Sequence, residues 1–129
     1  MNQDISFAPQ LFIPAGTFDI SFYEKAFGAV VLRRFDNADG SIHVAELSIQ
    51  GALFHLHETS SHKKYLAPAV CGAITTLIGL FVTDADQLME QALQAGAELI
   101  HMPQSFDYGY RQGELRDPFG HAWMLQQRC

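Results

Sequence analysis

Apolar residues along the chain form short runs that recur in the same order in each half of the sequence. Each half opens with one such run, LFI from Leu11 and LIGLFV from Leu77. A segment with helical spacing of apolar residues follows, and then come three more apolar runs separated by turn residues. The order βαβββ is therefore predicted twice. The three later runs are VVLRR, HVAELSI and ALFHLH in the first half, and AELIHM, GELRD and HAWML in the second.

The helix of the second half carries the clearer start and stop signals. Asp84 is the predicted N-cap, with Gln87 as its capping-box partner, and Gly96 ends the helix in a left-handed conformation. Gly28 ends the first helix in the same way. The predicted buried stripes are Phe18, Phe22, Ala26 and Phe27 in the first helix, and Leu88, Ala92 and Ala95, widened by Met89 and Leu93, in the second.

The two halves are related by a constant offset. Gly28 and Gly96 are separated by the same number of residues as Glu46 and Glu114. The sequence therefore predicts one α+β domain over residues 1–129, made of two pseudo-symmetric βαβββ modules at about 8–58 and 73–127 joined by a linker at 59–72. Each set of strands buries one face against its own helix, so we expect a curved mixed sheet around a cleft.

Composition and charge exclude some classes of binding partner and of cellular location. The net charge is −6, and basic residues are concentrated only at Lys63 and Lys64, so neither nucleic acid nor an anionic membrane surface is expected as a partner. No apolar stretch is long enough to span a membrane, and the N-terminus lacks the pattern of a secretory signal. Cys71 and Cys129 have no metal-ligand spacing and are predicted to be reduced thiols in a cytoplasmic protein.

Two segments give the chain a resemblance to a known family. GYRQGELRDPFGHAWML resembles the closing hairpin of vicinal oxygen chelate proteins, the superfamily of glyoxalase I, extradiol dioxygenases and the bleomycin-resistance proteins, and FYEKAFGA resembles their first helix. With HVAEL, the sequence is most similar to the subgroup described as demethylubiquinone-methyltransferase-like or phosphonate-operon-like. The resemblance implies paired modules around a cleft and a homodimer.

The resemblance also implies where a metal would be bound. Metal-dependent members place one ligand on the first strand and one on the last strand of each module. These positions fall at about Ala8 and on His55 in the first module, and on Leu77 and Met124 in the second. Only His55 suits a divalent metal, because Leu77 has no donor atom and Met124 offers a soft thioether. The usual metal site is therefore expected to be missing.

The sequence HLHE leaves a metal-dependent alternative open. His55 and His57 point to the same face of a strand, about 6.5 Å apart, and such pairs do bind metals. Gln10, Glu46 or His43 could complete a set of ligands. In the other interpretation His57 lies in water and His55 forms a hydrogen bond to a ligand or a side chain. We favour the second interpretation, because a catalytic metal generally has three protein ligands.

Arg111 has two open interpretations. In the YGYR segment it could clamp a carboxylate or phosphate of a ligand, or it could pair with Asp117 or Glu114. Tyr108 and Tyr110 could line a pocket or pack at the base of the loop.

Other residues are assigned structural roles. Asp117, Pro118 and Gly120 have the chemistry of a turn, and Trp123 is predicted to lie in the core. Ser60, Ser61 and His62 are interpreted as a polar loop. The segment 58–72 is long enough to act as a lid over the cleft.

Two functions of different classes follow. The first is a small-molecule-binding protein that holds an aromatic or acidic ligand without metal or other cofactor. The second is a divalent-metal-dependent lyase, isomerase or dioxygenase that uses His55 and His57. The candidate ligand-binding residues are His55, His57, Leu77, Met124, Arg111, Tyr110 and Gln10.

Overall fold

The order βαβββ occurs twice in the computed structural model, which describes residues 5–60 and 65–129. The α+β prediction is confirmed, and a short additional helix lies in the linker between the two halves. The elements are β1 (Gln10–Ile13), α1 (Phe22–Phe27), β2 (Val30–Asp36), β3 (Ile42–Ile49), β4 (Ala52–Glu58), α2 (Pro68–Cys71), β5 (Leu77–Phe81), α3 (Ala85–Gln94), β6 (Glu98–Ser105), β7 (Tyr110–Arg116) and β8 (Ala122–Arg128).

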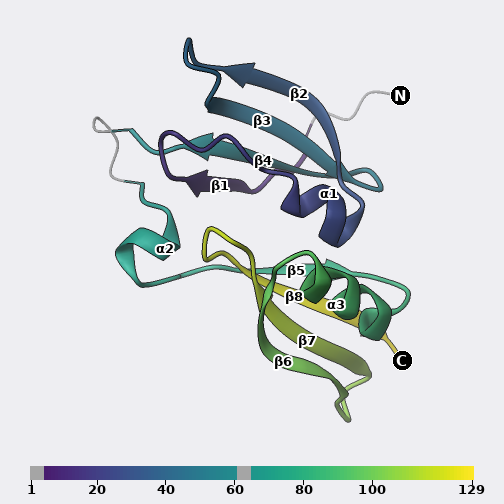
Figure 1. The fold of residues 1–129 in the computed structure, drawn as a ribbon. Coiled ribbons are helices and arrows are strands. Elements are labelled where there is room, and N and C mark those ends of the chain that lie inside the picture. Colours follow the sequence, from purple (N-terminus) through teal and green to yellow (C-terminus); the bar gives the residue numbers. More distant parts are fainter. Residues whose placement is uncertain (1–4, 61–64) are drawn as a thin grey trace.

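Each half forms its own four-stranded mixed sheet (Figure 1). The strand order is β1-β4-β3-β2 in the first sheet and β5-β8-β7-β6 in the second. The first strand of each half runs parallel to the last, and the other neighbouring pairs are antiparallel. Gln10 lies beside His55 in the first sheet as Gly79 lies beside Met124 in the second. The repeat seen in the sequence is thus a repeat of strand order and register.

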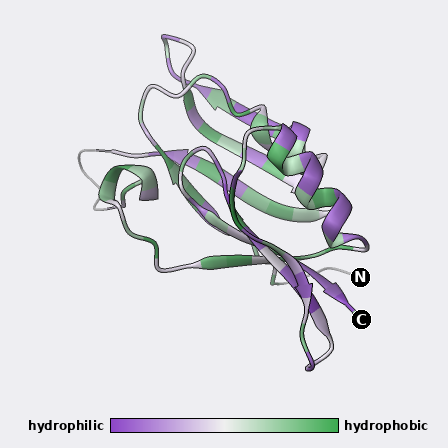
Figure 2. Ribbon diagram, turned by 60° about the horizontal axis from the view of Figure 1, so that its bottom comes forward, coloured by the Kyte–Doolittle hydropathy of each residue, from purple (hydrophilic) through white to green (hydrophobic). Residues whose placement is uncertain are grey.

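Helices α1 and α3 pack together in the space between the two sheets (Figure 1). One face of each sheet packs against them, and hydrophobic and hydrophilic residues alternate along the strands (Figure 2). On β3, for example, Ala45 and Leu47 are buried, whereas Glu46 between them faces away from the helices. The two modules share one core, and each sheet keeps a second face directed away from it, which we call its open face.

Two details of the helices differ from the prediction. Helix α1 begins only at Phe22, so Phe18 precedes it and is 56% exposed instead of joining the buried stripe. Asp84 does cap α3, accepting a hydrogen bond from the backbone N–H of Gln87, but the Gln87 side chain donates forward to Gln91 instead of back to the cap. In α3 the buried residues are Ala85, Met89 and Ala92, since the helix packs between the sheet and α1.

Asp117 connects the two modules at the centre of the core. Its Oδ2 accepts hydrogen bonds from the Tyr23 hydroxyl of α1 at 2.6 Å and from the Trp123 Nε1 of β8 at 3.0 Å. Its Oδ1 accepts from the backbone N–H groups of Phe119 and His121. The predicted turn role of Asp117 and the predicted core position of Trp123 are both confirmed, and the same carboxylate also holds a tyrosine of the other module.

The described part of the linker packs against the second module. Ala67 is buried, and the backbone N–H of Ala69 donates to the carbonyl of Phe119 at 3.0 Å. On the other side, the Tyr65 ring stacks on Phe12 with centroids 4.8 Å apart. The predicted lid at 58–72 includes residues 61–64, which lie outside the described residues. These four residues are Ser61 and His62 of the predicted polar loop and the basic pair Lys63 and Lys64. None of the described helices has the length and apolar character needed to span a membrane.

Candidate functional site

The open face of the first sheet brings together three of the predicted site residues. His55 and His57 on β4 point to the same side, and Gln10 on β1 is the register partner of His55. The Gln10 Nε2 atom lies 3.0 Å from His55 Nδ1 and forms a hydrogen bond with it. Phe12, the partner of His57, lies beside it with ring centroids 5.6 Å apart. The result is a polar pair flanked by an aromatic pair.

The hydrogen bonds assign different roles to the two histidines. An amide nitrogen only donates, so Nδ1 of His55 is the acceptor and the ring proton sits on Nε2. His57 is the reverse, because its Nδ1 donates to the backbone carbonyl of Glu58 at 2.8 Å, so the neutral ring carries its lone pair on Nε2. His55 therefore presents a donor to this face and His57 an acceptor.

His43 and Glu58 form a second polar group at the end of β4. His43 Nδ1 lies 2.6 Å from one Glu58 oxygen, and the Asn37 side-chain amide donates to the other at 3.1 Å. These hydrogen bonds, that of His43 above all, lower the pKa of the Glu58 carboxyl. Among residues 5–60 and 65–129, no group of three or more His, Cys, Asp or Glu side chains is placed to hold a metal ion.

The open face of the second sheet carries another part of the predicted site. Leu77, Met124 and Tyr110 occupy positions of β5, β8 and β7 that share this face. Tyr110 contacts the ring of Phe81, with centroids 5.6 Å apart. Phe81 occupies in this module the position of Phe12 in the first, so an aromatic residue flanks both open faces. The same face also carries polar and charged side chains, so it mixes apolar with polar groups: Gln112, Glu114 and Arg116 of β7, and Gln126 of β8.

Arg111 lies on the opposite face of β7, toward α3. Its Nε and Nη2 atoms donate to the two carboxylate oxygens of Asp86, each at 2.8 Å, and its Nη1 donates to Ser105. This pairing lowers the pKa of Asp86 and raises that of Arg111. Of the two interpretations, the structure shows the structural pairing, but with Asp86, since Glu114 pairs with Arg116 and Asp117 is engaged in the core. Arg111 is thus separated from the other candidates.

The two groups of candidate residues do not meet within one chain. The helix-facing sides of both sheets pack in the same core, so His55 on the first sheet and Met124 on the second lie on faces directed away from it. The candidate residues thus form two separate groups, one on the open face of each sheet.

The sequence prediction missed several side chains around these two groups. Phe12 and Phe81 follow from the period-two alternation along the first strand of each module, which places them on the open faces. Tyr65 and Asp86 had no comparable signal, since each reaches its partner from a loop or helix distant in the sequence.

Comparisons with known proteins agree with this architecture. The chain matches the Glyoxalase/Bleomycin resistance protein/Dioxygenase superfamily over residues 19–125 and belongs to this family. It is 35% identical over 130 residues to an uncharacterized protein of Mycobacterium bovis, covering 98% of this chain and 86% of that protein.

Solved structures share the fold at lower identity. TioX from Micromonospora sp. ML1 aligns with a TM-score of 0.69 at 23% identity, covering 97% of each chain. FosX, the genomically encoded fosfomycin resistance protein of Listeria monocytogenes, has a TM-score of 0.69 at 15% identity, covering 100% of this chain and 96% of that one. At these identities the likeness establishes the fold alone.

Proposed function

We propose that the protein binds a small aromatic or acidic molecule without a metal. The observation that carries this proposal is the hydrogen bond from Gln10 to His55. It occupies the lone pair of Nδ1 and leaves a proton on Nε2, so His55 has no free lone pair for a metal but has an N–H for an acceptor oxygen of a ligand. Tyr65, which stacks on Phe12 next to this pair and is 57% exposed, supplies an aromatic surface for a flat ligand.

We further propose that two copies complete the site. The open face of the first sheet in one copy would lie opposite the open face of the second sheet in the other, which brings Met124 and Leu77 of the partner subunit toward His55. Exposed apolar side chains on both open faces support this arrangement: Leu77 and Phe81 are each 44% exposed, and Phe35 is 42% exposed. Burial of such surface is what stabilises a dimer interface.

The dimer is expected to depend on Leu77. Light scattering should give twice the chain mass of 14.4 kDa for the native protein and a single chain mass for Leu77→Glu, because an unpaired carboxylate in an apolar interface is strongly unfavourable. Val70→Glu, on the exposed surface of α2, is the control and should remain dimeric. A native protein of single-chain mass would contradict the paired site.

Ligand binding is expected to depend on His55. With 2-naphthoate as the probe, His55→Ala should weaken binding by about tenfold or more, since a charge-assisted hydrogen bond to the carboxylate is lost. Calorimetric titration measures the change. Arg111→Met is the matched control, because its guanidinium faces α3 and should leave the affinity unchanged.

Elemental analysis of the purified native protein separates this proposal from the metal-dependent alternative. We expect no stoichiometric Zn, Mn, Ni or Fe, even after reconstitution. A metal present in the native protein and lost in His55→Ala would instead establish a metal site at His55 and favour the metal-dependent lyase, isomerase or dioxygenase alternative.

The assignment to the demethylubiquinone-methyltransferase-like or phosphonate-operon-like subgroup, and the cytoplasmic location, belong to the same proposal. The segment HVAEL in β3 supports the subgroup assignment. The cytoplasmic location is supported by Cys71 and Cys129, which are exposed thiols without a disulfide.

A further inference from the structure

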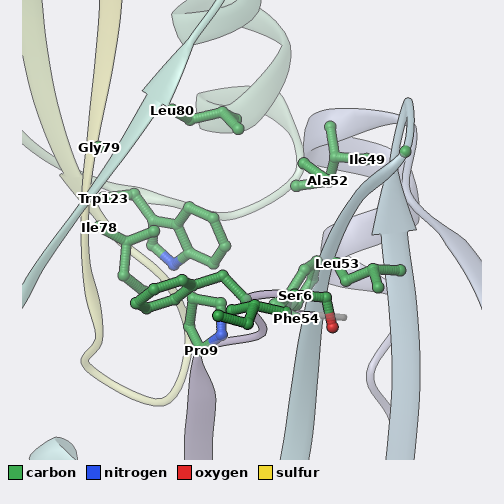
Figure 3. A pocket seen from close by; sticks show the side chains of 13 residues that line it. Ser6, Pro9, Ile49, Ala52, Leu53, Phe54, Ile78, Gly79, Leu80 and Trp123 are labelled. Atoms are coloured by element: carbon green, nitrogen blue, oxygen red, sulfur yellow. The ribbon is translucent and has the colours of Figure 1, made fainter. Parts of the chain in front are cut away.

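A cavity of about 580 Å³ is lined by residues of both modules. Figure 3 shows the side chains around it, with β5 and β8 of the second module on one side and the start of β4 on the other. Its volume is in the range of about 300–1,000 Å³ that is usual for small-molecule sites. Its lining residues include Phe7, Ala52, Phe54, Ile78, Leu80 and Trp123.

The walls of the cavity are almost entirely apolar. Aliphatic and aromatic side chains make up the lining, and Ser6 contributes the only polar side chain among the described residues that line it. The indole N–H of Trp123 is not available to a ligand, because it donates to Asp117. A charged group placed here would lose its hydration without gaining a partner. The chemistry of the cavity therefore selects a neutral, apolar molecule.

The cavity is separate from the proposed ligand site. Phe54 and Trp123 belong to the helix-facing sides of their sheets, whereas His55, the neighbour of Phe54, points to the open face. At the mouth, Phe7 lines the cavity but is 88% exposed, so an apolar occupant would remove part of this ring from water. A ligand in the cavity would thus pack against apolar side chains of both modules.

We propose that this cavity is a second binding site, for a neutral aliphatic or aromatic molecule, independent of the His55 site. Trp123, the single tryptophan of the chain, lines it and reports on occupancy. Because bromine quenches tryptophan fluorescence on contact, a brominated ligand in the cavity will lower the emission of Trp123.

The test is a fluorescence titration of the full chain with 6-bromohexan-1-ol and with its carboxylate analogue, 6-bromohexanoate. Saturable quenching by the alcohol, at roughly tenfold lower concentration than by the carboxylate, is the expected result, because burial of the charge opposes binding. Hexan-1-ol, which lacks bromine, should restore the emission by displacement. Equal quenching by the two probes, or quenching that does not saturate, would overturn the proposal.

Three variants locate the site. Ala52→Phe fills the cavity and should abolish saturable quenching, whereas Ala52→Ser, at the same position without the added volume, should retain it. His55→Ala should also retain it, so failure of the open-face site and failure of this one are distinguishable. If instead a second copy of the chain covers the cavity, the native dimer will show no quenching and Ala52→Phe will weaken dimerisation, and the proposal is then wrong.

Discussion

Asp117→Ala is expected to lower the free energy of unfolding by about 3–5 kcal/mol, a large part of the total for a domain of this size. The substitution leaves the Tyr23 hydroxyl and the Trp123 N–H buried without an acceptor, and each such group costs about 1–3 kcal/mol. It also removes the acceptor for two backbone N–H groups of the turn. Urea denaturation measures the loss.

Tyr23→Phe provides the matched control. It removes one hydrogen bond but leaves the Asp117 carboxylate its three other donors, so a smaller loss of about 1–2 kcal/mol is expected. In the double variant the two losses should not add, because both remove the same Tyr23–Asp117 hydrogen bond. Full additivity, or an Asp117→Ala loss below that of Tyr23→Phe, would mean that Asp117 does not connect the modules.

This connection shows what the sequence could and could not predict. The elements followed from the apolar runs and turn residues, because strand and helix periods are local properties of the chain. The turn role of Asp117 was also local and was predicted. Its hydrogen bond to Tyr23 joins residues of different modules and depends on α1 packing beside β8, which no local pattern encodes.

In the candidate site, too, local features could be predicted from the sequence, whereas features that depend on tertiary packing could not. That His55 and His57 share a face follows from strand alternation, and the structure confirms it. Gln10 joins them because β1 pairs with β4, which the sequence did not predict. The pairing of Arg111 with Asp86 required knowing that α3 lies over that face of β7. The separation of His55 from Met124 depends on how the two sheets pack around their helices, which the repeat alone leaves undetermined.

The buried Tyr23 hydroxyl is expected to make the protein sensitive to alkaline pH. Burial, and then the neighbouring Asp117 carboxylate, raise the pKa of Tyr23 well above its ordinary value of 10.0. In the unfolded chain the same hydroxyl ionises near pH 10, whereas in the folded chain it stays protonated. The contribution to stability is thus fully present below pH 10 and is lost as the pH rises from there toward the folded-state pKa.

Ionisation of this one group in the unfolded chain is expected to lower the free energy of unfolding by about 1.4 kcal/mol for each pH unit above 10. Urea denaturation at pH 9, 10, 11 and 12 measures it, with Tyr23→Phe as the comparison. The variant should be less stable than the native protein at pH 9 but should lose stability less steeply above pH 10, so the two curves converge or cross. Parallel curves would show that Tyr23 ionises equally in both states, and the hydroxyl would then not be sequestered between Asp117 and the core. Convergence would place the protonated Tyr23–Asp117 hydrogen bond among the interactions that hold the two modules together.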